Sequence, residues 1–274
     1  MAGGSFLATG HNRLLFRLEM TSAHSSPLRR LVPLFKRFVP GPVLRTRSKI
    51  MRARMQARNT GRSSAEVFSE IYSKQLWGGA DGELCSGDGS SGAAADAYCS
   101  FVARFIAEHD IASAVDIGCG DFRIGARIAP HLESYTGVDV AAPVIAHHCE
   151  HHAGPGRRFL QLDASEQPLP DADLCMVRQV LQHLSNTQIA SMLPHLERFR
   201  YVLVTEHYPD EQHLVANRDK VHGADTRVVD GSAVILSAPP FNWYHGELLL
   251  SMPAGDSGAM AKETLRTFLY QPAF

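Results

Sequence analysis

The stretch Val115-Asp-Ile-Gly-Cys-Gly-Asp121 decides the fold of this chain, because it links a buried strand to a glycine turn. An apolar run ends near Asp116, and Gly118 and Gly120 follow with one residue between them. Glycine lets the backbone turn sharply and come close to a bound molecule. A second acid, Asp121, stands directly after the turn. The stretch therefore predicts a ligand that needs a close backbone and accepts carboxylates beside it.

Strand patterns and helix patterns alternate on both sides of this turn. Short apolar runs predict five strands at residues 112–117, 134–138, 158–162, 174–178 and 201–205. Apolar residues at helical spacing predict helices at 64–75, 93–109, 122–132, 142–151 and 186–199. Two further strands, at 247–252 and 263–270, predict an antiparallel pair at the sheet edge. The order indicates an α/β fold with a doubly wound, Rossmann-like, mostly parallel sheet.

Polar residues follow the predicted strands at the points where the strands end. Ligands of doubly wound sheets bind at the carboxyl ends of the strands. These ends hold residues 116–120, Asp139, Asp163, 178–183 and 206–207. The sequence therefore predicts one ligand site along this edge.

The glycine turn differs from the fingerprint of dinucleotide-binding proteins, which is G-x-G-x-x-G. Gly118 and Gly120 match the first two glycines, but Arg123 stands at the third position. Asp121 would also repel a pyrophosphate. These differences disfavour an NAD(P)-dependent oxidoreductase and favour a ligand without phosphates, including a cationic one.

The same residues resemble the class I S-adenosylmethionine-dependent methyltransferases, over roughly residues 64–274. The resemblance rests on Asp116-x-Gly118-x-Gly120, an acid at Asp139 that lies 19 residues after Gly120, Asp163-Ala164, and Val180-Leu-Gln-His-Leu-Ser185. The C-terminal antiparallel pair is also similar to that family. The resemblance implies methyl transfer with S-adenosyl-L-methionine as the cofactor.

The resemblance also implies contacts for this cofactor. Asp116 would lie near its cationic end, Asp139 would accept hydrogen bonds from both ribose hydroxyls, and Asp163 would bind the adenine amine. Arg178 and Gln179 would face the methionine part. The cofactor-binding candidates are Asp116, Gly118, Cys119, Gly120, Asp139, Val140, Asp163, Ala164, Arg178, Gln179, Trp77 and Ser90.

A narrower resemblance involves residues outside the cofactor pattern. Trp77-Gly, Ser86-Gly-Asp-Gly-Ser90, Gln182–Ser185, Thr205-Glu-His207 and residues 217–241 are similar to a bacterial group of small uncharacterised methyltransferases. Such proteins are often encoded among genes for glycan or natural-product assembly. We expect a small molecule or glycan as the acceptor, methylated on a hydroxyl oxygen.

Several polar residues are candidates for the acceptor side. A hydroxyl nucleophile needs a base, and His183, Glu206 and His207 all follow strand ends. His183 could equally pack or cap the next helix. Asn217, Asp219 and Arg227 lie in a long connection, and such connections often cover a substrate. Arg227 could hold an anionic group or form an ion pair within its loop.

Two other motifs carry weaker signals. The run His147-His-Cys-Glu-His-His152 has histidines at i and i+4, which can bind zinc. We expect these histidines at the solvated end of a helix, far from the strand ends, and so predict no metal. Pro239-Pro240 reads as a stiff turn rather than as part of a site that methylates base amino groups.

Charge divides the chain into an arm and a body. Residues 1–62 hold 13 Lys or Arg and one acid, a formal charge of +12, and the remaining residues hold 14 basic and 27 acidic side chains, a charge of −13. We expect a basic arm at 1–62 and a methyltransferase domain at 63–274. Within that domain we expect a lid at 63–110 and a substrate-cover insertion at 208–244.

The arm leaves several partners open. Residues 28–38 mix apolar and basic side chains, which suits an anionic membrane surface, a nucleic acid, a transit peptide or a solvated tail. The five scattered cysteines predict reduced thiols and a cytoplasmic protein, peripheral at a membrane if the arm binds one. A non-catalytic nucleotide-binding or scaffold protein with this fold is the remaining alternative.

Overall fold

The computed structural model describes residues 41–79, 83–255 and 262–272. The chain divides into one unit that ends at Lys49 and a second that runs from Ile50 to Phe274, and the fold belongs to the second unit. The apolar and basic run at 28–38 lies outside the described residues. The proposed boundary between arm and domain at residue 62 therefore stays a prediction.

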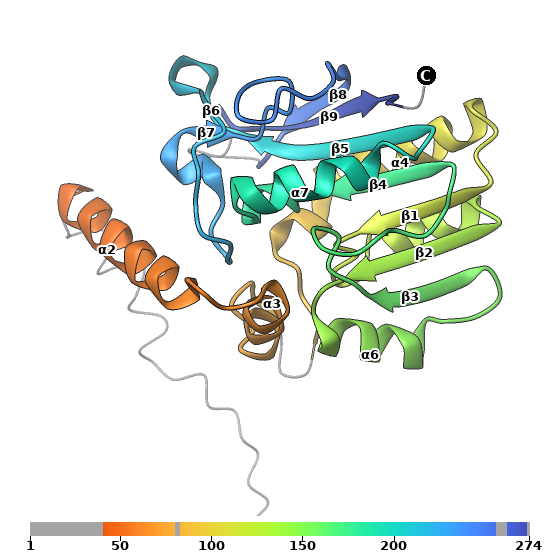
Figure 1. Cartoon of the computed structure of the whole chain (residues 1–274), viewed down its shortest axis with the longest axis horizontal. Coiled ribbons are helices and arrows are strands. Elements are labelled where there is room, and N and C mark those ends of the chain that lie inside the picture. The colour runs from red at the N-terminus through yellow and green to blue at the C-terminus, as the bar shows by residue number, and fades with distance from the viewer. Residues whose placement is uncertain (1–40, 80–82, 256–261, 273–274) are drawn as a thin grey trace, which may run out of the picture. The chain divides into compact units, whose positions relative to one another are not determined.

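A seven-stranded sheet forms the centre of the fold (Figure 1). The strands are β1 (Ser113–Ile117), β2 (Ser134–Asp139), β3 (Arg157–Gln161), β4 (Leu174–Arg178), β5 (Tyr201–Tyr208), β8 (Glu247–Pro253) and β9 (Thr264–Tyr270). Their order is β3-β2-β1-β4-β5-β9-β8, and β1 to β5 are parallel. Strand β9 is antiparallel to both of its neighbours. This topology confirms the predicted doubly wound sheet with an antiparallel C-terminal pair.

Helices lie on both faces of this sheet (Figure 1). The α-helices are α2 (Gly41–Asn59), α3 (Ser64–Ser73), α4 (Gly92–Glu108), α5 (Gly125–Ile128), α6 (Ala142–His151) and α7 (Asn186–Leu196). Short 3-10 turns are η1 (Asp88–Ser90), η2 (Ala129–His131), η3 (Leu181–His183), η4 (Glu211–His213) and η5 (Arg227–Asp230). Turn η3 directly follows the end of β4, so it stands at the carboxyl edge of the sheet.

Alternate residues of the buried strands contribute to two hydrophobic cores. Val115 and Ile117 belong to the core that α3 and α7 complete, whereas Ala114 belongs to the core of α4. Side chains alternate between the two faces of a strand, which explains this division. Asp116 therefore lies on the same face as Ala114, beside the buried ring of Tyr135.

Two helices end at other residues than the sequence predicted. Helix α3 begins at Ser64, as expected, but ends at Ser73 and not at residue 75. Helix α3 is capped by Ser63, whose hydroxyl accepts from the Glu66 N–H at 3.2 Å while the Glu66 carboxylate accepts from the Ser63 N–H at 2.9 Å. The helix expected over 122–132 shortens to α5 and η2. Phe122 has a φ of 62°, which is incompatible with a helix, and Pro130 lacks an N–H for the helical ladder.

The segment 208–244 forms a compact cap with its own two-stranded sheet, β6 (Val215–Ala216) and β7 (Ser232–Ala233). Asn217 holds this cap together. Its amide nitrogen donates to the carbonyls of Ile235 at 2.8 Å and Pro239 at 2.9 Å, and its oxygen accepts from the Ile235 N–H at 2.7 Å.

The last turns of α2 contact this cap. Gln56 Nε2 lies 3.3 Å from the Asp225 carboxylate, and Asn59 Nδ2 donates to the His222 carbonyl at 3.0 Å. Within the described residues, no helix combines the length and the apolar character needed to cross a membrane. All five cysteines are free thiols.

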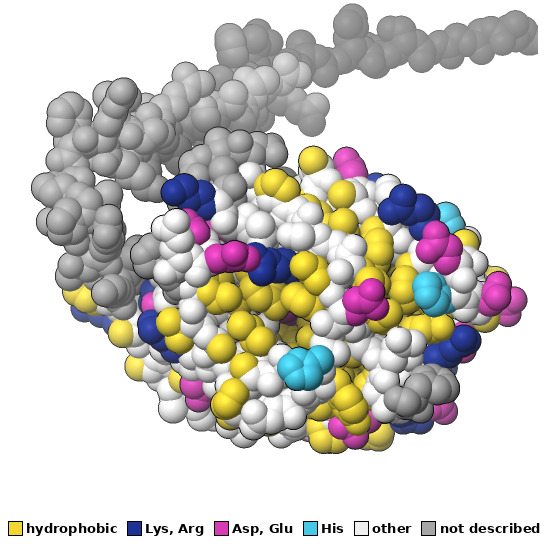
Figure 2. All heavy atoms as spheres, turned by 90° about the horizontal axis from the view of Figure 1, so that it is seen from above, with side chains coloured by type: hydrophobic (Ala, Val, Ile, Leu, Met, Phe, Trp, Pro, Cys, Tyr) yellow, Lys and Arg dark blue, Asp and Glu magenta, His cyan; other side chains and the backbone are white. Residues whose placement is uncertain are grey.

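The upper edge of the molecule, at β8, carries exposed apolar side chains. Figure 2 shows hydrophobic side chains gathered at the centre of this face, with charged side chains around them. Tyr244 and Leu248 are among the exposed apolar residues there. Charged side chains beside an open strand edge limit its pairing with other chains.

Candidate functional site

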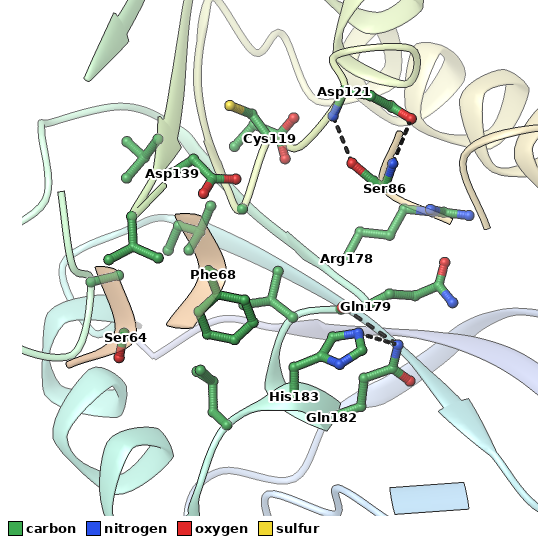
Figure 3. Close-up of a pocket in the computed structure, with 18 of the residues that line it drawn as sticks. Ser64, Phe68, Ser86, Cys119, Asp121, Asp139, Arg178, Gln179, Gln182 and His183 are labelled. Carbon is green, nitrogen blue, oxygen red and sulfur yellow. Dashed lines mark hydrogen bonds between the residues drawn. The ribbon is translucent and has the colours of Figure 1, made fainter. Parts of the chain in front are cut away.

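A cavity opens at the carboxyl ends of β1, β2 and β4 (Figure 3). Its wall includes the glycine turn, the ends of these strands, turn η3 and residues of α3. Residues that precede β1, among them Trp77, Ser86 and Ser90, close the remaining side. Segments far apart in the sequence thus meet at the edge where a parallel sheet binds its ligands.

The glycine turn has a backbone that only glycine adopts easily. Gly118 and Gly120 have φ values of 68° and 55°. A Cβ atom on Gly118 would lie 2.4 Å from a methyl carbon of Val180. A Cβ atom on Gly120 would lie 2.3 Å from the Ser86 hydroxyl. Both glycines are therefore required for the turn to fit between its neighbours.

Two buried acids stand at the ends of adjacent strands. Asp116 accepts a hydrogen bond from the Tyr135 hydroxyl at 2.6 Å, and burial raises the pKa of Asp116 to about 6. Asp139 accepts from the N–H groups of Gly120 at 3.2 Å and Ala141 at 2.9 Å. Burial likewise raises the pKa of Asp139 to about 6, against the effect of its backbone hydrogen bonds. Both acids are ionised at neutral pH and keep lone pairs for a ligand.

The lid residues 86–90 are tied to the turn by Asp121. The Asp121 carboxylate accepts from the Ser86 N–H at 3.0 Å and from the Ser90 hydroxyl at 2.8 Å. In return, the Asp121 N–H donates to the Ser86 hydroxyl at 2.7 Å (Figure 3). Arg178 donates to the Gly89 carbonyl at 2.7 Å. The serine-rich run therefore lies against the cavity, as a lid would.

Aromatic rings form the opposite end of the cavity. The Trp77 ring lies 5.2 Å from the rings of Tyr72 and His183 and 6.1 Å from that of Phe68. The Trp77 indole N–H donates to the Ala224 carbonyl at 3.3 Å. Through this bond the cap holds the Trp77 ring in place, although no residue of the cap lines the cavity wall.

His183 is held in one tautomer within the wall. Its Nδ1 lies 3.1 Å from the Gly223 carbonyl, so Nδ1 carries the hydrogen and Nε2 carries a lone pair. The Gln182 amide nitrogen lies 3.3 Å from that Nε2 (Figure 3). Burial lowers the pKa of His183 to about 4, and the nearby Lys220 ammonium acts in the same direction. His183 is therefore a neutral imidazole in the cavity wall, with Nδ1 donating to Gly223 and Nε2 accepting from the Gln182 amide.

The other two candidate bases lie outside the cavity wall. Glu206 is buried, and its carboxylate accepts from the N–H groups of Val180 at 3.1 Å, Leu181 at 2.8 Å and Gln182 at 3.1 Å. His207 points to the opposite face of β5, where its Nε2 lies 2.9 Å from the Glu263 carboxylate. The sequence predicted both residues just beyond a strand that ends at residue 205, but β5 continues to Tyr208, so their side chains alternate between its two faces.

The three acceptor-side candidates also lie outside the wall. Asn217 is the centre of the cap. Asp219 accepts from the Asn186 N–H at 2.8 Å, at the start of α7. Buried Arg227 donates to the Leu184 carbonyl at 2.6 Å and to that of Arg218. Asn217 thus joins parts of the cap, while Asp219 and Arg227 join the cap to the segment between β4 and α7. A contact of these residues with substrate stays a prediction.

Most of the cofactor-binding candidates do line the cavity. They are Asp116, Gly118, Cys119, Asp139, Val140, Asp163, Ala164, Arg178, Gln179, Trp77 and Ser90, while Gly120 contributes through the turn. The sequence missed wall residues that include Phe68, Tyr72, Ser86 and Asp121. The sequence placed Ser86 in the serine-rich run and Asp121 after the glycine turn, but it did not predict that these two residues bind each other. Their contact spans 35 residues and depends on tertiary structure.

The histidine run also differs from its expected position. His148 is only 1% exposed, and its Nε2 lies 2.7 Å from the Gly120 carbonyl. His148 therefore packs under the glycine turn, whereas Cys149, Glu150 and His151 of the same run are exposed.

We predict that Glu206 positions η3 through its three amide contacts. Glu206→Ala should lower the free energy of unfolding by roughly 3 kcal/mol, because three buried N–H groups lose their acceptor. Glu206→Gln keeps an acceptor oxygen and should lose less than half as much. Urea denaturation measures both, with Glu247→Ala on exposed β8 as the control. Equal losses in the two Glu206 variants would contradict this role.

Comparison with known proteins agrees with the geometry. Residues 115–200 match the family model described as a methyltransferase domain. Uncharacterized methyltransferases of Mycobacterium tuberculosis and Mycobacterium bovis are 33% identical over 78 residues, which is 28% of this chain. The chain spans 40% of the length of these curated relatives.

Two solved structures are similar over a larger part of the chain. One is the N-methyltransferase NodS from Bradyrhizobium japonicum with S-adenosyl-L-homocysteine, with a TM-score of 0.45, 16% identity, and coverage of 64% of this chain and 86% of that one. The other is magnesium protoporphyrin IX methyltransferase from Synechocystis, with a TM-score of 0.42, 16% identity, and coverage of 64% and 77%. Both are too distant to assign an activity. The match to the methyltransferase-domain model thus covers residues 115–200, from β1 to α7, within a sheet of strand order β3-β2-β1-β4-β5-β9-β8.

Proposed function

We propose that this protein is an S-adenosyl-L-methionine-dependent methyltransferase that methylates a hydroxyl oxygen of a small molecule or glycan. One observation carries the proposal. Asp116 and Asp139 end adjacent strands on either side of the glycine turn, and both open onto the cavity that contains His183. This arrangement combines a place for a cationic cofactor with an acceptor for a hydroxyl hydrogen.

The residues present fit this cofactor. Asp139 keeps lone pairs for ribose hydroxyls, and the apolar side chains of Val140, Leu162 and Ala164 line the wall beside Asp163, where an adenine ring would pack. Asp116 offers negative charge to an ammonium or sulfonium group. Gly118 lines the cavity with its backbone, and Val180 occupies the space where a side chain of residue 118 would stand.

S-adenosyl-L-methionine would supply an electrophilic methyl group. The chain supplies orientation, which accounts for much of the catalysis of such bimolecular steps. The lid at 86–90 excludes water from the cavity, and the rings of Trp77 and Phe68 offer an apolar surface to the acceptor. In this proposal the acceptor hydroxyl takes the place of the Gln182 amide at Nε2 of His183 and donates to its lone pair, which orients the oxygen. With a pKa of about 4, His183 would act mainly by orienting the hydroxyl, and the hydroxyl proton would pass to solvent water as the methyl group moves to the oxygen.

The competing functions fit less well. A dinucleotide would place its pyrophosphate beside the Asp121 carboxylate, which lines the cavity and pairs with the lid serines. A scaffold protein that has lost its ligand would not need two buried acids around an open cavity, since buried carboxylates are unfavourable without partners.

We first predict selective binding of the proposed cofactor. Calorimetric titration should give binding of S-adenosyl-L-methionine and S-adenosyl-L-homocysteine, and none of NAD or NADP. Asp139→Ala should weaken binding roughly 100-fold, because two ribose hydrogen bonds are lost. Asp171→Ala, at an exposed acid outside the cavity, is the control. Binding of NAD alone would replace the proposed function with that of an oxidoreductase.

A second prediction concerns pH. Asp116 has a pKa raised to about 6, so its negative charge is lost as the pH falls through that value. A cationic cofactor should therefore bind more weakly at low pH, by roughly tenfold between about pH 8 and about pH 5. The dependence should become shallower in Asp116→Asn, and the part that remains should come from Asp139, whose pKa is also about 6. An affinity that rises at low pH would show that Asp116 does not face the cationic group.

A third prediction separates the two candidate histidines. His183→Gln should slow methyl transfer at least about 100-fold while S-adenosyl-L-homocysteine affinity stays within a few-fold. His207→Gln is the matched control, because His207 lies on the other face of β5, and it should keep full turnover. The assay follows methyl transfer from S-adenosyl-L-methionine to a panel of phenols and sugars. Loss of turnover in His207→Gln alone would reverse the assignment.

A further inference from the structure

Helix α6 carries a cluster of histidines that the proposed reaction does not use. His147, His148 and His152 each direct one ring nitrogen into a common space, and these nitrogens lie within 4.8 Å of one another. His152 is the C-cap residue of α6, four residues after His148, and the rings of these two histidines lie 5.4 Å apart. The cluster lies beside the cavity, next to the glycine turn, but does not line the cavity wall.

A buried hydrogen bond sets the tautomer of His148 that can bind a metal ion. Its Nε2 lies 2.7 Å from the Gly120 carbonyl, and a carbonyl only accepts, so Nε2 carries the hydrogen. Its Nδ1 therefore carries a lone pair. In the described part of the chain this buried Nδ1 has no hydrogen-bond partner. Metal-ligating histidines typically donate their other N–H to a backbone carbonyl in this way.

The two other histidines can complete a site. His147 and His152 are half-buried, so their rings can rotate toward His148 with little repacking. Nitrogens bound to one zinc ion lie about 3.4 Å apart, which requires only a small closure of the cluster. The Cys149 thiol donates to the Phe159 carbonyl at 3.6 Å and so points away from the cluster.

The chemistry of the donors selects the class of metal. Neutral imidazole nitrogens suit zinc and neighbouring transition metals, whereas calcium and magnesium prefer oxygen. We propose that His147, His148 and His152 form a zinc-class transition-metal site on α6, with the fourth position open to water. The site does not depend on the proposed methyl transfer.

The position of the site has a structural consequence. A metal bound to the Nδ1 of His148 keeps the hydrogen on Nε2 and so maintains the bond to Gly120. The metal would thus stabilise the glycine turn from beneath. Anything that binds only the folded site raises the stability of the folded state.

The test is calorimetric titration of Zn²⁺ into reduced, tag-free full-length protein that has been treated with a chelator. We expect one Zn²⁺ per chain and a higher melting temperature with the metal. His152→Gln and His147→Gln should each weaken binding by at least about tenfold and abolish the thermal shift. Both replaced side chains are half-buried, so these variants should fold; circular dichroism without metal checks this.

His151→Gln is the matched control on the same helix. The rings of His147 and His151 lie 4.4 Å apart, and this pair could chelate zinc at the surface without His148. Unchanged Zn²⁺ affinity in His151→Gln, with loss in His152→Gln, supports the proposed site. The reverse pattern, or no binding by the wild-type protein, overturns it.

Discussion

The left-handed backbone of the glycine turn is the constraint on which the rest of this site depends. Asp139 accepts from the Gly120 N–H, and His148 binds the Gly120 carbonyl. Ser86 fills the space where a Cβ atom of Gly120 would stand. Strand β2, helix α6 and residues 86–90 therefore all contact Gly120, which has no side chain. Their positions relative to one another are coupled through that contact.

Buried polar residues around the cavity fall into two groups with different physical roles. The first group forms hydrogen bonds with backbone groups and so holds η3 and the cap in place; it consists of Glu206, Asn217 and Arg227. A buried backbone donor or acceptor without a partner is unfavourable, which explains why polar and charged side chains bind these backbone groups. Asp116 and Asp139 instead keep carboxylate lone pairs at the cavity wall. Only groups of this second kind are free to meet a ligand.

The Asp121 carboxylate has two effects on the cavity. Asp121 accepts hydrogen bonds from Ser86 and Ser90, which holds residues 86–90 against the cavity, and it also places a negative charge in the cavity wall. Arg178 binds the same lid through Gly89, and burial lowers the pKa of this guanidinium from its usual value. The charges at the cavity therefore favour a ligand that carries positive charge or none.

The sequence by itself determined the sheet, because strands and helices of this type are encoded by local apolar patterns and by glycine. It also located Asp116, Gly118, Gly120 and Asp139, since the ends of parallel strands meet at one edge whatever the loops do. Tertiary structure alone decided which polar neighbours reach the cavity. The alternation of β5 sends Glu206 and His207 to opposite faces, and long-range packing brings His148 under the turn. Contacts between residues far apart in the chain leave no periodic signal, and so they became visible only in the folded molecule.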